Sequence, residues 1–124
     1  MAERKKEVKD KKIRLFKGVS RVVWGFERVY KKYIHSEESG GVWAYVRHLS
    51  EQERLASKVV QIDESILFKV THNPKLTKDL YIEFGEKTYS IVSIDPYEYN
   101  KSDLVIRANE ISPPVYDEVE YDEY

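Results

Sequence analysis

The sequence predicts a mostly β protein: a small antiparallel β-barrel or sandwich with one short helix and extended N- and C-terminal arms. Runs of β-branched and aromatic residues recur at short intervals and are bounded by glycine, proline or polar turn residues. The links between most runs are short, which favours antiparallel neighbours. Opposite charges collect at the two ends, with a net charge of +5 over residues 1–17 and −5 over residues 113–124.

The length and composition indicate one β domain flanked by two charged arms. A chain of 124 residues has room for one modest core. We expect a basic N-terminal arm over 1–17, the β-barrel domain over 18–112, and an acidic, tyrosine-containing arm over 113–124. The chain has no cysteine, which favours an intracellular or phage-like origin. No apolar run approaches the roughly 20 residues that span a bilayer, so we expect no membrane partner.

The first third of the chain predicts a tail followed by strands. Residues 1–12 have almost no apolar face and are expected to be a solvated tail. Residues 21–26 form a β-type run, and 29–34 form either a loop or the continuation of that strand. Turn residues at 36–41 lead into a strand over 42–48, whose aliphatic and aromatic side chains alternate.

A short helix is expected directly after the strand at 42–48. Ser50 and Glu53 have the capping-box spacing, in which the hydroxyl accepts from a backbone amide and the glutamate reaches back. Two helical turns over 51–57 would present only two apolar side chains, too few for a core to hold firmly. We therefore interpret this helix as a candidate mobile element.

The second half of the chain predicts a β-meander. Its strands are expected at 66–71, 80–84, 88–94 and 104–108. Gly85 predicts the hairpin turn, and Pro96 should end the third strand because proline has no donor for the ladder. Alternation in that strand predicts two faces, one with Tyr89, Ile91 and Ser93 and the other with Ser90, Val92 and Ile94.

The residues that usually carry chemistry are scattered. The three histidines, His35, His48 and His72, are far apart and lack a second ligand at metal spacing, so we expect surface or strand-end positions. There is no glycine-rich phosphate loop, and the carboxylates lie in the tail or on solvated faces. We predict a protein that is not an enzyme and that binds neither a cofactor nor a metal.

The order of these segments resembles the head–tail joining family of tailed bacteriophages, also called head-closure, head-completion or stopper proteins. The resemblance rests on the 42–46 strand, the following segment with serine, glutamate and alanine, and the strands of the meander. Gly85 and Tyr89 stand where the family has a hairpin glycine and the tyrosine after it. The match covers about 20–111. Family members usually carry arginine and aspartate before the strand at residue 80, where only Asp79 corresponds.

The resemblance implies a structural protein of the virion. Such proteins form a homo-oligomeric ring, expected here to be a dodecamer. The ring lies at the head–tail interface, between the portal or adaptor protein and a tail-completion or tail-terminator protein. It closes the channel that holds packaged double-stranded DNA and offers a docking surface for the tail. Before incorporation into the virion, the subunits would reside in the host cytoplasm.

The resemblance also implies functional segments. The connection over 49–64 corresponds to the loop that faces the channel in the family, with candidate gating residues Ser50, Glu51, Gln52, Glu53, Arg54 and Lys58. The two charged arms lie outside the family pattern, and from their charge and tyrosines we expect candidate partner contacts at Arg4, Lys5, Lys6, Lys9, Tyr116, Tyr121 and Tyr124. For the tail tyrosines, docking on a neighbouring subunit and simple disorder both remain open.

Two alternatives belong to other classes or positions. A small nucleic-acid-binding barrel of the OB or SH3 type would use the basic arm and exposed Trp24 and Trp43 as stacking platforms. The near-neutral charge of the barrel region argues against it. A tail-completion subunit of the same connector would share the size and the β content.

Overall fold

The computed structural model describes residues 8–35, 38, 40–48, 65–97 and 100–121. The described residues form eight strands and no helix, so the mostly β prediction is confirmed. The short helix expected over 51–57 lies outside the described residues. The strands are β1 (Lys11–Val23), β2 (Phe26–Tyr33), β3 (Val42–His48), β4 (Ser65–Thr71), β5 (Tyr81–Phe84), β6 (Lys87–Tyr97), β7 (Asn100–Ile111) and β8 (Glu118–Tyr121).

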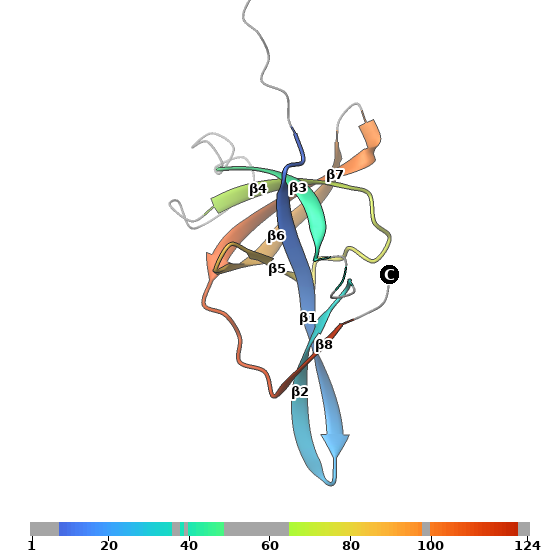
Figure 1. Cartoon of the computed structure of the whole chain (residues 1–124), viewed down its shortest axis with the longest axis vertical. Coiled ribbons are helices and arrows are strands. Elements are labelled where there is room, and N and C mark those ends of the chain that lie inside the picture. The colour runs from blue at the N-terminus through green and yellow to red at the C-terminus, as the bar shows by residue number, and fades with distance from the viewer. Residues whose placement is uncertain (1–7, 36–37, 39, 49–64, 98–99, 122–124) are drawn as a thin grey trace, which may run out of the picture.

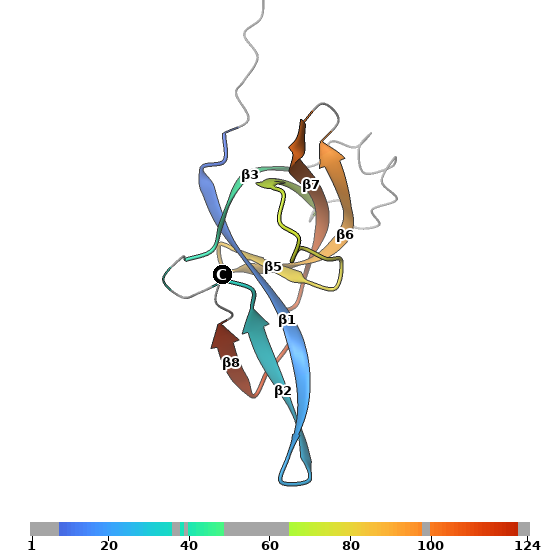
Figure 2. The same cartoon turned by 90° about the vertical axis from the view of Figure 1, so that its right-hand side faces the viewer.

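Six of the strands close into a ring (Figures 1 and 2). The order is β3-β4-β7-β6-β5-β1, and β1 returns to pair with β3. All pairings inside the ring are antiparallel, as the short links predicted. The closing seam is short, because only Lys11, Lys12 and Ile13 of β1 pair with β3.

The ring encloses the main core. Its fully buried side chains include Ile13 and Leu15 of β1, Phe68 of β4 and Ile106 of β7. Leu76 and Leu80, from the connection between β4 and β5, are buried in the same core. In Figure 1 this connection lies at the opposite end of the ring from the β5–β6 turn. One end of the ring is therefore filled by the chain itself.

Beyond the ring, β1 and β2 continue as a projecting hairpin (Figures 1 and 2). Val23 pairs with Phe26, which leaves Trp24 and Gly25 as a two-residue turn. Both turn residues have positive φ, 53° and 80°, the pattern of a type I′ turn. The single strand predicted over 21–26 is therefore wrong, because the chain reverses within that run.

The expected arms overlap the fold. β1 begins at Lys11, inside the segment expected as the N-terminal arm over 1–17, and Ile13 and Leu15 are fully buried. Lys12 and Arg14 alternate with these buried residues along the strand. The net charge of the segment does not reveal this alternation. At the other end of the chain, the segment expected as an acidic arm contains β8, which pairs in parallel with β2.

The strand β6 departs from the predicted alternation. A register shift between Ile91 and Ser93 inserts an irregularity against β7. Ile91 and Ile94 consequently both pack on the main core, whereas Val92 packs against Leu67 on another cluster. The predicted assignment of Ile91 and Ile94 to opposite faces is wrong.

Two further predictions need correction. β6 continues to Tyr97, so Pro96 does not end it; Pro96 pairs with Leu104 next to a second register shift, where a missing donor is tolerated. His35 was expected at the surface or a strand end, but it is fully buried and its ring centre lies 5.4 Å from that of Tyr33.

Candidate functional site: interaction surfaces

The tip of the β1–β2 hairpin gathers three highly exposed large apolar side chains. Trp24 is 94% exposed, Val22 is 75% exposed and Phe26 is 72% exposed. A bulky residue with φ near +53° is disfavoured by about 1–2 kcal/mol relative to the right-handed region. Neither the strained backbone nor the exposed indole is compensated by contacts in the core. We define Val22, Trp24 and Phe26 as the hairpin tip.

The base of the hairpin is an aromatic cluster outside the main core. Phe16 stacks on Tyr81 with ring centres 5.5 Å apart and meets Tyr33 and Tyr116 edge to face. The ammonium group of Lys31 lies 4.4 Å from the centre of the Phe16 ring. β1 is thus buried on both faces here, which anchors the projecting hairpin to the ring.

A charge pair within this cluster joins β2 to β5. Lys31 Nζ donates to Glu83 Oε2 at 2.7 Å, and the Tyr33 hydroxyl donates to the same oxygen at 3.0 Å. Burial alone would raise the pKa of Glu83, but the hydrogen bonds from Lys31 and Tyr33 hold it below its usual value. Burial would likewise lower the pKa of Lys31, yet its hydrogen bonds to Glu83 and Tyr33 leave it raised.

The acidic C-terminal segment lies along the hairpin. The guanidinium of Arg21 makes two hydrogen bonds to the Glu120 carboxylate, at 3.0 and 3.1 Å. Asp117 engages Val29 twice, since its backbone amide donates to the Val29 carbonyl and its carboxylate accepts from the Val29 amide. Tyr116 packs on Phe16, and burial raises the pKa of its hydroxyl. The acidic side chains Asp117 and Glu120 and the ring of Tyr116 therefore contact residues of the same chain.

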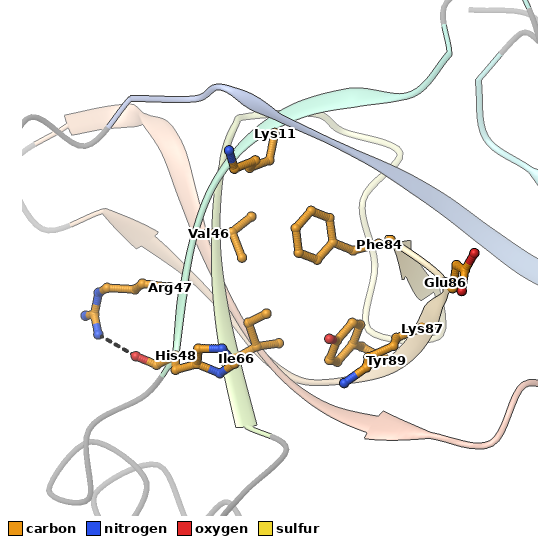
Figure 3. A pocket seen from close by; sticks show the side chains of 10 residues that line it. Lys11, Val46, Arg47, His48, Ile66, Phe84, Glu86, Lys87 and Tyr89 are labelled. Atoms are coloured by element: carbon orange, nitrogen blue, oxygen red, sulfur yellow. Dashed lines mark hydrogen bonds between the residues drawn. The ribbon is translucent and has the colours of Figure 1, made fainter.

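The end of the ring opposite Leu76 and Leu80 holds a cavity of about 500 Å³. Val46, Ile66, Phe84 and Tyr89 direct their side chains toward one another across it (Figure 3). The other lining residues come from the strands and the β5–β6 turn: Lys11, Arg47, His48, Gly85, Glu86 and Lys87. We call this space the open-end cavity. It combines an apolar interior with a charged rim, in which Lys87 Nζ lies 3.2 Å from Glu110 Oε1 and Lys11 Nζ lies 3.7 Å from Asp10 Oδ2.

Few of the predicted site residues fall within the described structure. Ser50, Glu51, Gln52, Glu53, Arg54, Lys58, Arg4, Lys5, Lys6 and Tyr124 lie outside the described residues. Lys9 forms a salt bridge with Asp103 and donates to the Thr71 hydroxyl, so it contacts its own barrel. Tyr121 lies in β8, in register with Tyr33. The structure therefore places Tyr116 and the backbone of Tyr121 at different points along the β1–β2 hairpin, and Lys9 beside β4 and β7.

The residues considered for other chemistry do not form a site. Among the described residues, no group of three or more histidine, aspartate or glutamate side chains could hold a metal ion. Trp24 lies at the hairpin tip and Trp43 lies on β3 with the Lys12 ammonium 4.9 Å from its ring centre. The two indoles are on different parts of the molecule and do not form one stacking track. No helix in the described part of the chain could span a membrane.

Sequence reasoning missed the hairpin tip and the open-end cavity. A two-residue turn ending in glycine between two β-type runs is a hairpin signal, and Trp24-Gly25 satisfies it. Tryptophan at the first turn position masked this signal, because asparagine, aspartate or glycine is usual there. The cavity had no local signal, since its lining comes from β1, β3, β4, β5 and β6.

Comparison with known protein families identifies the family to which this chain belongs. The family model described as phage head completion protein matches residues 10–111, most of the chain. The chain belongs to the phage head completion protein family. The match begins at residue 10, one residue before β1. This family membership confirms the resemblance and identifies a bacteriophage head structural protein, a virion component.

A solved structure supports the architecture. The solution structure of protein SF1141 from Shigella flexneri 2a is 15% identical and superposes with a TM-score of 0.64, over 84% of this chain and 94% of that chain. At this identity the likeness concerns the fold alone. The search of curated proteins gave no match.

Proposed function

We propose that this head completion protein forms a ring at the head–tail connector, below the portal or adaptor protein. The ring closes the channel around packaged DNA and presents the surface on which the tail docks. It acts by assembly and steric closure, without catalysis or a cofactor. The subunits are made in the host cytoplasm and enter the virion when the head is completed.

One observation carries this proposal beyond family membership. The strained and exposed hairpin tip, with Trp24 94% exposed, is a surface that only an external partner would cover. Such a projection suits a subunit that works inside an assembly. The tail-completion alternative has no observation of its own in its favour.

Electron microscopy of particles lacking this gene tests the position in the virion. We expect capsids that fail to retain DNA beside free, intact tails. Closed, DNA-filled heads with defective tails would instead place the protein on the tail side. Unchanged virions would contradict a structural role at the connector.

We further propose that the connection over 49–64 faces the channel, with Gln52, Arg54 and Lys58 nearest to the DNA. His48 and Ile66 are paired in the β3–β4 ladder, so both ends of this connection leave the ring at the same edge. Basic side chains there would contact phosphates, and Glu51 and Glu53 would limit the attraction.

Replacing 49–64 by a short glycine–serine link separates closure from assembly. We expect rings of normal size in electron micrographs and heads that lose DNA, measured as nuclease-sensitive DNA. Heads that retain protected DNA with this variant would refute the closure role of the segment while leaving the ring intact.

A further inference from the structure

We propose that the hairpin tip of one subunit inserts into the open-end cavity of a second copy of this chain. The inference deepens the proposed function, since it rests on ring assembly and names the contact that joins neighbouring subunits. Both surfaces are described above, and they lie on different parts of the molecule. Their pairing would join the subunits head to tail.

The length of the hairpin determines how far its tip extends from the ring. Phe16 is the last residue of β1 that pairs on both sides, with Tyr81 of β5 and Tyr33 of β2. From Phe16 to Val23 the strand advances seven residues, or about 23 Å at the usual rise of a β-strand. In Figures 1 and 2 this projection points away from the strand ring, so the tip lies clear of the subunit's own barrel.

The chemistry of the two surfaces is complementary. The tip offers an indole, a phenyl ring and an isopropyl group, and the cavity of about 500 Å³ offers an apolar interior large enough for the indole. The rim adds the cations of Lys11 and Lys87, which are attracted to the face of a tryptophan ring. The exposed Glu27 and Arg28 beside Phe26 bring one charge of each sign, which would meet the mixed charges of the rim, Lys11, Arg47 and Lys87 with Glu86.

The strain at Trp24 gives an independent reason. An Asn-Gly turn would fit the positive φ at this position better than Trp-Gly does. Retaining tryptophan costs the free chain stability and exposes an aromatic side chain. Both costs are offset if the indole becomes a buried anchor at an interface, where tryptophan is enriched.

The size of the contact predicts how it behaves. The three tip side chains bring on the order of 400 Å² of contact surface, about half of what each partner contributes to a standard stable interface. A single contact of this size is weak, so the isolated chain should be mostly monomeric when dilute. Because the contact is heterologous, copies can close into a ring, where every subunit is held by two such contacts.

Disulfide trapping in the full-length chain tests the pairing, and the natural sequence has no cysteine to interfere. We mix a Val22→Cys protein with a Glu86→Cys protein at high concentration and oxidise briefly. We expect a disulfide-linked heterodimer between positions 22 and 86, identified by mass spectrometry, in excess over both homodimers. A Lys75→Cys protein, altered at an exposed residue beside the filled end of the ring, is the matched control and should not cross-link preferentially.

A second variant tests the role of the indole with a substitution that should stabilise the fold, so that a lower cross-linking yield cannot result from unfolding. Trp24→Asn in the Val22→Cys protein should raise the midpoint of thermal unfolding by about 2–4 °C, because it relieves the turn. The same change should reduce the yield of heterodimer at least tenfold. Trp43→Ala, which removes the other exposed indole, should leave the yield unchanged.

Two results would overturn the proposal. The first is a Val22–Glu86 yield no higher than that of the Lys75 control, and the second is an equal yield with Trp24→Asn. If assembled connectors from particles still showed rings by electron microscopy, the ring function would stand and the contact alone would be wrong. If the cross-link formed but deletion of the gene left virions unchanged, the contact would stand and the proposed function would be wrong.

Discussion

Glu83 contributes to stability through its two donors, and the sign of its pKa shift sets the pH range of that contribution. The folded-state pKa lies below the ordinary 4.5, so the contribution is complete above that pH and is lost as pH falls through the folded value. The pKa of Lys31 is raised above 10.5, so its contribution is present below that pH and lost only as pH rises through the folded value.

Glu83→Gln should therefore destabilise the protein at neutral pH and weaken the acid dependence of stability. Removing the charged partner of a half-buried pair should cost about 1–2 kcal/mol in the free energy of unfolding at neutral pH. Urea titrations from roughly pH 2 to 7 measure both effects. Glu110→Gln, which alters a pair with the 61% exposed Lys87, should change the curve little. A Glu83→Gln curve parallel to that of the unaltered protein would contradict the assignment.

Among the five glycines, Gly41 leaves the least space for a side chain. Its φ is 122°, and a Cβ atom added there would lie 2.3 Å from the Ile13 carbonyl oxygen, at the β1–β3 seam. Gly41→Ala should lower the free energy of unfolding by more than about 2 kcal/mol. Gly85→Ala, at a turn with φ 62° and open space around it, should cost only about 1 kcal/mol. Equal losses in denaturant unfolding would show that the seam tolerates a side chain.

At the scale of elements, β8 is an accessory to the hairpin. It pairs with β2 over four residues and adds the Arg21–Glu120 contact, while the ring closes without it. Truncation after residue 112 should keep the ring folded and speed amide hydrogen exchange in β2 at Tyr30 to Tyr33. A Glu120→Gln chain of full length is the milder control. Exchange that accelerates equally in β4 and β7 would instead mean that the ring depends on β8.

Sequence patterns predicted the strands that are dominated by apolar and β-branched residues. They missed strand segments in which charged residues or register shifts obscure the alternation of buried and exposed side chains. β3, β4 and β5 were placed within one residue, because apolar and β-branched side chains dominate them. The start of β1 was missed because lysine and arginine occupy its outward positions. The far ends of β6 and β7 were missed because register shifts and Pro96 break the period. A sequence also gives no measure of φ, so the strain at Trp24 required the structure.

At the scale of the whole molecule, ring closure depends on three residue pairs at the N-terminal end of β1. Deleting residues 1–8 should leave the fold intact, because it retains both the seam and Lys9, which is bound to Asp103. Deleting residues 1–13 removes the seam and the fully buried Ile13, with an expected loss of at least about 3 kcal/mol. Thermal unfolding of the two truncated proteins checks this. Equal stability would support the expected boundary at residue 17.

The length of β1 has a mechanical consequence. One uninterrupted strand of 13 residues is both the seam of the ring and one leg of the projecting hairpin, with no break between them. Force applied to the hairpin along its axis therefore pulls β1 lengthwise past β3 and β5, which loads their hydrogen bonds together. A force applied sideways would peel the same bonds one after another. The molecule is thus built to resist tension along the hairpin more strongly than tension across it.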